Sequence, residues 1–174
     1  CINHLTLHSD MANKRIALFQ CSFDPFTRGH ESIVMRALSI FDEVVIAVVH
    51  NSQKHGFLPV DLRVRLIEDA FKGESRVKVV CSEGLTVNIA KEVGACCLLR
   101  GVRNTIDFEY EKGNAEVNLR LSGIETVLLY TSPATSHISS TIVRELLKFD
   151  KEIKDYMPEH LSTEMLEKVK TFKP

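Results

Sequence analysis

Short apolar runs alternate with amphipathic stretches along the chain. Five runs are apolar on both faces, as in the buried strands of a parallel sheet, and they cover residues 15–21, 43–50, 77–81, 96–99 and 126–130. The stretches between them carry apolar residues three and four positions apart, which indicates helices with one buried face. Helices are therefore expected at residues 31–41, 59–71, 86–93, 106–121 and 139–149, with Pro158 opening a last one.

Strand and helix alternate five times in this order. The alternation predicts an α/β fold, a Rossmann-like doubly wound five-stranded parallel sheet with helices on both faces and right-handed crossovers. In such sheets a ligand binds beyond the carboxyl ends of the strands. The polar motifs of this chain follow the predicted strands, so we expect them to form one composite site.

The loop after the first strand, residues 22–30, has the features of an anion-binding site. Pro25 stops the strand, Thr27 can cap the next helix, and Gly29 removes a side chain where that helix begins. Free N–H groups and the positive end of the helix dipole then face the space above the sheet. His30 stands in the first turn. The loop lacks the Gly-Lys-Ser/Thr ending of a P-loop and the three glycines of a dinucleotide fingerprint.

Cationic and polar side chains are expected to gather around this loop. The candidates are Ser22, His30, Lys54, Arg100, Arg103 and the helix start at residues 139–141. Such a cluster suits several phosphate groups bound at once. The sequence shows no obvious carboxylate pair for acid–base catalysis and no Ser or Cys with an evident activating partner. Phosphoryl-type transfer depends mainly on positioning and charge stabilisation, so the cluster predicts nucleotidyl transfer.

Each member of the cluster also has a purely structural interpretation. Lys54 could be a solvated loop lysine, and Ser139 with Ser140 could serve only to cap a helix. Arg100 follows a buried strand, where an unpaired charge is costly, so a functional role is favoured for it. Three other histidines are interpreted as loop or surface residues, namely His50, His55 and His137.

Length and composition suit one domain. The chain has 174 residues, of which 44% are hydrophobic and 26% charged, as in soluble globular proteins. A net charge of -1 argues against a general binder of nucleic acids or membrane surfaces, and no apolar run approaches the roughly 20 residues that span a bilayer. We expect a single domain at residues 11–174, with Met11 as the natural start and residues 1–10 as a disordered extension.

The five cysteines are interpreted as free thiols. None lie at Cys-x-x-Cys spacing, so neither a disulfide framework nor a zinc site is expected, and the pattern favours a reduced, cytoplasmic protein. Cys81, Cys96 and Cys97 fall in apolar runs and are expected to be buried. No metal site formed by protein side chains is predicted.

Several motifs resemble those of known nucleotidylyltransferases. Thr27-Arg28-Gly29-His30 is similar to the Thr/His-x-Gly-His signature of that superfamily. More discriminating segments resemble the phosphopantetheine adenylyltransferase family, in its order and nearly its spacing from about Lys14 to Pro158. They are residues 22–30, 41–48, Arg-Gly-Val-Arg at 100–103, Asp-Phe-Glu-Tyr-Glu at 107–111 and Ile-Ser-Ser-Thr-Ile-Val-Arg-Glu at 138–145.

The resemblance implies a reaction in which ATP and 4′-phosphopantetheine give dephospho-coenzyme A and pyrophosphate. Mg²⁺ would be bound mainly through the ATP phosphates. The resemblance further implies a homo-oligomer, in this family a hexamer, and competition by coenzyme A as a feedback inhibitor. Nucleic acids and membranes are not expected as partners.

The resemblance also implies roles for individual residues. Ser22 would orient the attacking phosphate, His30 would stabilise charge at the ATP α-phosphate, and Lys54 and Arg103 would complete the catalytic set. Ser22, Lys54, Thr86 and Arg100 would bind phosphopantetheine. ATP would be bound by Ser22, Phe23, His30, Gly101, Val102, Arg103, Glu111, Thr135, Ser136, His137, Ile138, Ser139, Ser140 and Thr141.

The sequence departs from the family pattern at a few positions. Cys21 replaces a usual Gly and puts the backbone bend there in doubt, Thr86 replaces a more apolar residue, and Thr135 stands where some members have an aromatic. Lys112-Gly113-Asn114 places a glycine within a helix, at a cost of roughly 1 kcal/mol against Ala. Two alternatives remain open: another nucleotidylyltransferase with a different phosphate acceptor, and a nucleotide-binding regulator without turnover.

Overall fold

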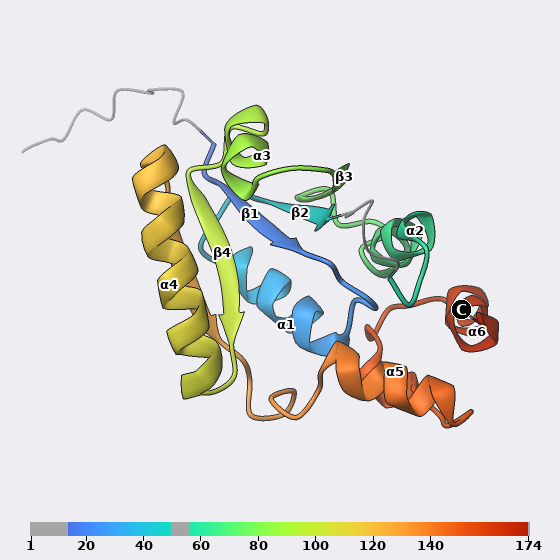
Figure 1. Ribbon diagram of the computed structural model, residues 1–174. Coiled ribbons are helices and arrows are strands. Elements are labelled where there is room, and N and C mark those ends of the chain that lie inside the picture. Colours follow the sequence, from blue (N-terminus) through green and yellow to red (C-terminus); the bar gives the residue numbers. More distant parts are fainter. Residues whose placement is uncertain (1–13, 50–55, 174) are drawn as a thin grey trace, which may run out of the picture.

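A computed structural model describes residues 14–49 and 56–173. Its five-stranded sheet is parallel throughout, in the order β3-β2-β1-β4-β5. The strands are β1 (Ile16–Cys21), β2 (Glu43–Val49), β3 (Val77–Ser82), β4 (Cys97–Val102) and β5 (Glu125–Tyr130). After β3 at one edge the chain returns to place β4 beside β1, so the strand order switches between β1 and β4. The predicted doubly wound, Rossmann-like fold is confirmed (Figure 1).

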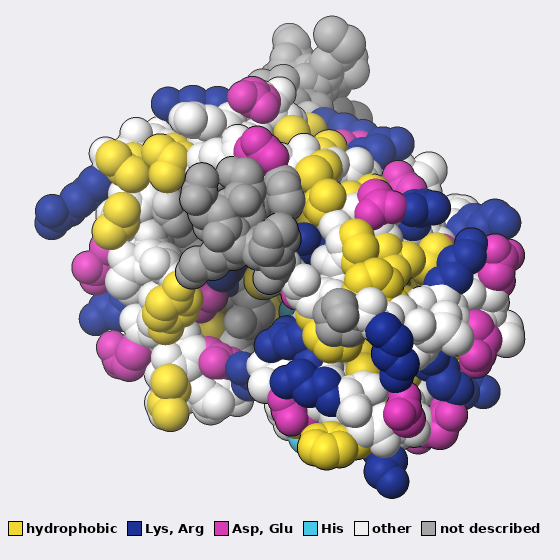
Figure 2. All heavy atoms as spheres, turned by 45° about the vertical axis from the view of Figure 1, so that its right-hand side comes forward, with side chains coloured by type: hydrophobic (Ala, Val, Ile, Leu, Met, Phe, Trp, Pro, Cys, Tyr) yellow, Lys and Arg dark blue, Asp and Glu magenta, His cyan; other side chains and the backbone are white. Residues whose placement is uncertain are grey.

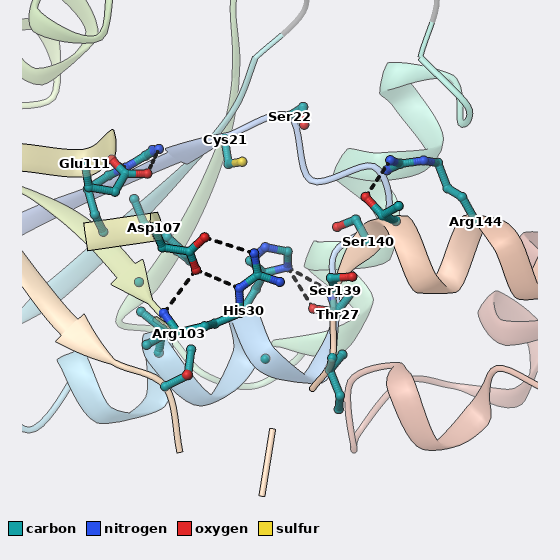
Figure 3. A pocket seen from close by; sticks show the side chains of 18 residues that line it. Cys21, Ser22, Thr27, His30, Arg103, Asp107, Glu111, Ser139, Ser140 and Arg144 are labelled. Carbon is teal, nitrogen blue, oxygen red and sulfur yellow. Dashed lines mark hydrogen bonds and ion pairs between the residues drawn. The ribbon is translucent and has the colours of Figure 1, made fainter. Parts of the chain in front are cut away.

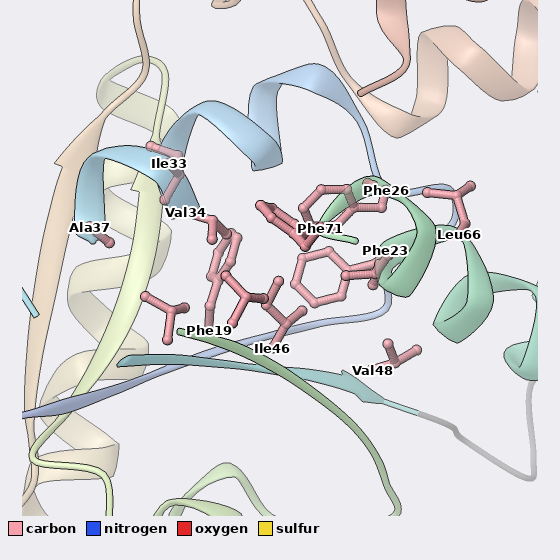
Figure 4. Packing of buried hydrophobic residues seen from close by; sticks show 14 of the residues in the cluster. Phe19, Phe23, Phe26, Ile33, Val34, Ala37, Ile46, Val48, Leu66 and Phe71 are labelled. Carbon is pink, nitrogen blue, oxygen red and sulfur yellow. The ribbon is translucent and has the colours of Figure 1, made fainter. Parts of the chain in front are cut away.

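Helices cover both faces of the sheet (Figure 1). The structure places them at α1 (Arg28–Ala37), α2 (Val60–Ala70), α3 (Thr86–Glu92), α4 (Thr105–Ser122), α5 (Ser140–Lys148) and α6 (Thr163–Thr171), with a short 3₁₀ turn η1 (Lys154–Tyr156) before α6. The larger core lies between the sheet and the α1, α2, α5 and α6 helices, and Phe19, Ile46 and Leu66 are among its buried residues (Figure 4). A smaller core on the opposite face joins Leu18 and Leu98 to Ile89 of α3.

The last helix begins later than predicted. Residues 158–161 do not belong to α6, and the Ser162 hydroxyl caps α6 by accepting the N–H of Met165 at 3.2 Å. The preceding segment is fixed by tertiary contacts, because the buried Glu31 carboxylate accepts the Glu159 N–H at 2.8 Å. The segment before α6 is thus held against α1 by a residue that is distant in the chain.

The fourth strand is longer than predicted. It continues through Arg100, Gly101 and Val102, which pair with residues 128–130 of β5. The apolar run ends at Leu99, so hydrophobicity alone could not show this extension. Its consequence is that Arg100 projects from a strand, not from a flexible loop.

Three predictions of burial were wrong. Cys81 lies on the edge strand β3 and Cys96 precedes β4, and both are exposed, whereas Cys97 is buried. The apolar spacing of the helix predicted at residues 139–149 places Ile142 on its buried face, yet Ile142 of α5 is 40% exposed, whereas Val143 and Leu147 are buried. An edge strand and a helix start each have one side without a packing partner, which the apolar pattern does not reveal.

Surface charge is mixed on the face that carries α2 and α6, where acidic and basic side chains are interspersed (Figure 2). This distribution agrees with the net charge of -1. Within residues 14–49 and 56–173, no helix combines the length and apolarity needed to cross a membrane.

Candidate active site

A cavity of about 360 Å³ lies where β1 and β4 end and α1 and α5 begin. We call it the central cavity (Figure 3). It stands at the point where the strand order switches, where doubly wound sheets bind their ligands. The sequence-predicted site residues on its wall are Ser22, His30, Arg100, Gly101, Arg103, Glu111, Ile138, Ser139, Ser140 and Thr141. The expected convergence of separate motifs is therefore found.

His30 is held as a neutral hydrogen-bond donor. Its Nδ1 accepts the backbone N–H of Thr27 at 3.0 Å, and Thr27 in turn caps α1. Because Nδ1 accepts, the neutral ring carries its proton on Nε2. Burial, followed by the positive charges of Arg103 and Arg100, lowers the pKa of His30 to about 4. The ring therefore stays neutral near pH 7 and offers an N–H to the cavity.

Aromatic rings support this state of His30. The rings of Phe23 and Phe26 each lie 5.2 Å from the imidazole, centroid to centroid, and Phe19 lies at 6.1 Å. They replace water around the ring and disfavour its protonated form. Phe23 itself has a φ of 46°, a backbone conformation that is rare for a non-glycine residue. The chain therefore bends at Phe23, while Cys21 belongs to β1 and pairs with Val48.

Two helix N-termini meet at the cavity. Thr27 is the N-cap of α1, and Ser139 caps α5 by accepting the Ile142 N–H at 3.2 Å. A Cβ on Gly29 would lie 3.7 Å from the carbonyl oxygens of Thr135 and Ile138, an ordinary van der Waals distance, so the start of α1 lies against the segment that leads into α5. Aligned N–H groups and dipoles at both starts favour bound anions.

Arg100 is the most strongly held cation of the site. Its Nε and Nη2 donate to the two carboxylate oxygens of Glu111 at 2.7 Å each, and its Nη1 donates to the carbonyl of Gln20. Burial opposes the charge, but the hydrogen bonds that Arg100 donates to Glu111 outweigh it and raise the pKa of Arg100. An arginine has five N–H groups, so two remain for a ligand.

Two further arginines line the cavity. Arg103 donates from Nε to Asp107 at 2.8 Å, and this ion pair raises its pKa. Arg144 donates to the Asp24 carbonyl at 2.6 Å and to the Thr141 hydroxyl at 3.0 Å. The sequence reading assigned no role to Arg144 or Asp107. The available signal was spacing, since each residue lies four positions from a predicted one on a helix or its entrance.

A second cavity of about 290 Å³ adjoins the first, and we call it the side cavity. Arg100 and Glu111 line both, while Thr86, Gln20 and Asn118 line the side cavity alone. The Thr86 hydroxyl donates to the Gln20 side-chain oxygen. Thr86 therefore lies away from the central cavity, on the wall of a cavity that shares Arg100 and Glu111 with it.

Other sequence-predicted residues do not line the central cavity. Phe23, Val102 and Thr135 are buried in the protein, and Ser136 and His137 are exposed. The ring of His137 packs against Tyr156 with centroids 6.3 Å apart. Lys54, His50 and His55 lie outside the described residues. Roles for Phe23, Val102 and Thr135 in binding would require their backbone groups.

Comparisons with known proteins agree with the fold and identify the family. Residues 18–146 match a family model described as cytidylyltransferase-like. Among solved structures, a putative nicotinate-nucleotide adenylyltransferase from Vibrio parahaemolyticus has a TM-score of 0.58 at 20% identity, covering 90% of this chain and 98% of that one. A bifunctional NMN adenylyltransferase/ADP ribose pyrophosphatase from Francisella tularensis has a TM-score of 0.66 at 14% identity, covering 92% and 50%. At these identities the two structures support the fold alone.

Curated relatives are closer in sequence. Phosphopantetheine adenylyltransferases from Phocaeicola vulgatus and Bacteroides thetaiotaomicron are 48% and 44% identical over 145 residues, which cover 83% of this chain and 96% of each relative. The enzyme from Porphyromonas gingivalis is 47% identical over 146 residues, 84% of this chain and 95% of the relative. The chain therefore belongs to the cytidylyltransferase-like family and, within it, to the phosphopantetheine adenylyltransferases.

Proposed function

We propose that this protein transfers the adenylyl group of ATP to 4′-phosphopantetheine, giving dephospho-coenzyme A and pyrophosphate. The observation that carries the proposal is the central cavity, where a neutral histidine donor, arginines and two helix N-termini converge. These groups are suited to bind and stabilise several phosphates at once. Membership of the phosphopantetheine adenylyltransferases supports the choice of acceptor.

In the proposed reaction an oxygen of the acceptor's phosphate attacks the α-phosphorus of ATP in line. A new P–O bond forms, the bond to the bridging oxygen breaks, and the electron pair leaves with pyrophosphate. Ser22 orients the attacking phosphate, while Arg100 and Lys54 hold it. His30 donates its Nε2–H to the α-phosphate, where negative charge grows in the transition state. It is not a base, since the attacking phosphate is already ionised.

ATP is assigned to the α4 and α5 side of the cavity. Gly101, Val102, Arg103 and Glu111, together with residues 135–141, would hold it, and Arg144 adds a cation on the same wall. The backbone amides at the start of α5 suit its phosphates. The pantetheine arm would leave the central cavity past Arg100 and occupy the side cavity, where Thr86 lies.

Magnesium would accompany ATP. Among residues 14–49 and 56–173, no three His, Cys, Asp or Glu side chains are placed to hold a metal ion. Asp107 and Glu111 on the cavity wall are each paired with an arginine, so they do not fit a magnesium site formed by the protein. The ion is therefore expected to be bound mainly through the ATP phosphates.

Oligomerisation and feedback are further parts of the proposal. A homo-oligomer, a hexamer as the family resemblance implies, is supported by apolar side chains exposed on α4, among them Ile106 at 79% and Leu121 at 57%. Coenzyme A shares the pantetheine arm of the product and would compete for the site. The proposed setting is the cytoplasm.

A pyrophosphate-release assay with ATP and 4′-phosphopantetheine tests the function, with dephospho-coenzyme A identified by its mass. Nicotinate mononucleotide and glycerol phosphate serve as competing acceptors. Preference for either of them would favour a related nucleotidylyltransferase. Tight ATP binding without turnover on any acceptor would favour a nucleotide-binding regulator.

A further inference from the structure

Arg63 is a buried arginine that no step of the proposed reaction uses. It belongs to α2 and is only 5% exposed. Its Nη1 donates to the carbonyl of Ser22 at 2.7 Å and to the carbonyl of Val49 at 3.4 Å. Ser22 follows β1 on the wall of the central cavity, and Val49 ends β2. One guanidinium thus links the carboxyl ends of two neighbouring strands.

A second contact joins the same segments. The buried carboxylate of Asp24 accepts the N–H groups of Phe57 at 2.6 Å and Leu58 at 2.8 Å. A side chain on Gly56 would approach the Asp24 carboxylate to 3.0 Å and Arg63 Nη2 to 3.3 Å. The two charged groups therefore enclose this glycine, and the loop after β1 is fixed against the entrance of α2.

Stability alone is a poor explanation for Arg63. Burying a guanidinium is costly unless its donors are paired, and the Arg63 Nε has no hydrogen-bond partner among the described residues. An apolar side chain of similar volume would avoid that penalty. What Arg63 supplies instead is a directional link to two carbonyl groups, one of them belonging to a site residue.

We propose that Arg63 is a positioning residue for the acceptor side of the site. By fixing the Ser22 and Val49 carbonyls, it sets where the Ser22 hydroxyl meets the attacking phosphate. The inference rests on the proposed function. Among the described residues, the hydrogen bonds of Arg63 reach the ends of β1 and β2 and none of the α4 or α5 groups assigned to ATP. Loss of the link should therefore affect the two substrates unequally.

The kinetic test compares Arg63→Lys and Arg63→Ala with Arg65→Ala. Arg65 lies on the same helix but is exposed and paired with Asp61, so it is a matched control. Lysine keeps the charge without the planar fork that spans two carbonyls. Both Arg63 variants should lose about tenfold or more in kcat/KM for 4′-phosphopantetheine, with the KM for ATP changed less than about threefold. Arg65→Ala should keep the kinetics of the parent, and ethylguanidinium should restore part of the activity of Arg63→Ala without changing that of Arg65→Ala.

Two outcomes would overturn the inference. One is unchanged kinetics in both Arg63 variants. The other is an equal rise of both KM values in step with lost thermal stability and without rescue by ethylguanidinium, which would make Arg63 merely structural. If Arg63→Ala does not fold, the kinetics of Arg63→Lys alone test the inference.

Hydrogen exchange tests the same link without substrate. In Arg63→Lys, the amides of residues 22–24, 26–27 and 56–58 should exchange faster than in the parent, while those of β1 and β4 remain protected. If the parent protein makes no dephospho-coenzyme A, the proposed function fails, and hydrogen exchange still decides the link. If turnover is normal and exchange is unchanged in Arg63→Lys, the role of Arg63 is refuted and the function stands.

Discussion

His30 illustrates how a short motif fixes the chemical state of one side chain. The Thr27 N–H occupies Nδ1, and three phenylalanine rings exclude water, so the imidazole is neutral and its remaining N–H can donate to a ligand. A donor that gains strength as charge grows on the α-phosphate lowers the barrier of the chemical step.

Replacing His30 should therefore reduce turnover more than binding. His30→Ala should lower kcat by at least about 10²-fold, roughly 2.7 kcal/mol, as when an oxyanion donor is removed. The KM for ATP should change little. His160→Ala, at an exposed histidine outside both cavities, is the control. A variant that loses stability but keeps kcat within a few-fold of the parent would show that His30 only packs.

The lowered pKa of His30 also predicts a loss of stability in acid. Between pH 6.5 and about 4 the unfolded chain binds a proton on this ring that the folded chain does not. The contribution of the neutral His30 ring to the free energy of unfolding is therefore fully present above pH 6.5. It declines as pH falls through this window, by at most about 1.4 kcal/mol per pH unit.

Burial raises the pKa of Glu31, so this carboxyl makes stability depend on pH in the opposite sense. The His30 variant and the parent should therefore both retain Glu31. Urea unfolding at pH 7 and pH 5 should show His30→Gln losing less stability on acidification than the parent. Equal losses would mean that His30 titrates as an ordinary histidine.

Arg100 and Glu111 depend on each other. Arg100→Ala leaves the Glu111 carboxylate buried without its partner and should lower stability on the order of 3 kcal/mol, and adding Glu111→Gln should recover part of that. The single variant should also bind 4′-phosphopantetheine about ten- to a hundredfold more weakly, with a smaller effect on ATP. Urea denaturation measures the stability of these variants, and calorimetric titration measures their affinity for each substrate. Arg120→Ala, at an exposed position on α4, is the control. A larger loss of ATP affinity would contradict the assignment of Arg100 to the acceptor.

At the scale of elements, the site depends on where helices begin. The start of α1 follows β1 directly, and α5 is fixed to the same loop by the Ser140 hydroxyl, which donates to the Pro25 carbonyl at 2.7 Å. Gly29 of α1 lies against the segment that leads into α5. Capping and anion binding therefore involve the same first turns.

Ser139 and Ser162 separate these two roles. Each caps a helix by accepting an N–H at 3.2 Å, so Ser139→Ala and Ser162→Ala should each cost about 1 kcal/mol of stability. Only Ser139→Ala should also weaken the binding of ATP, because α5 begins at the central cavity and α6 does not. Thermal unfolding and ATP titration of both variants check this. Equal ATP affinity in the two variants would leave Ser139 as a cap alone.

At the scale of the molecule, the strand order decides which loops meet. Because β4 lies beside β1, residues near 22–30 and near 100–111 share one cavity although about 70 residues separate them in the chain. Several large apolar side chains on the outer face of α4 are exposed, among them Ile106, Tyr110 and Leu121, which is unusual for a surface without a partner.

A charge on that face should disturb assembly. Leu121 is 57% exposed and lines neither cavity, so Leu121→Glu should yield a smaller species than the parent in light scattering while each subunit stays folded. Lys72→Glu, at an exposed position after α2, is the control. A monomeric parent protein would refute the proposed hexamer.

The sequence by itself determined the sheet, the helices and most residues of the central cavity. Continuous apolar runs and apolar residues three and four positions apart are local signals, and parallel strands bring their carboxyl ends to one edge. The motifs at 22–30, 100–103 and 138–141 could therefore be assigned to one site before their contacts were known.

Only the tertiary structure decided how the charges are paired and which groups hold the loops. Arg100 continues β4 and pairs with Glu111, Arg144 reaches the Asp24 carbonyl 120 residues earlier, and Arg63 reaches Ser22 across 41 residues. These partners leave no periodic trace, because a single hydrogen bond between distant segments depends on how the elements pack, not on the neighbours of either residue in the chain.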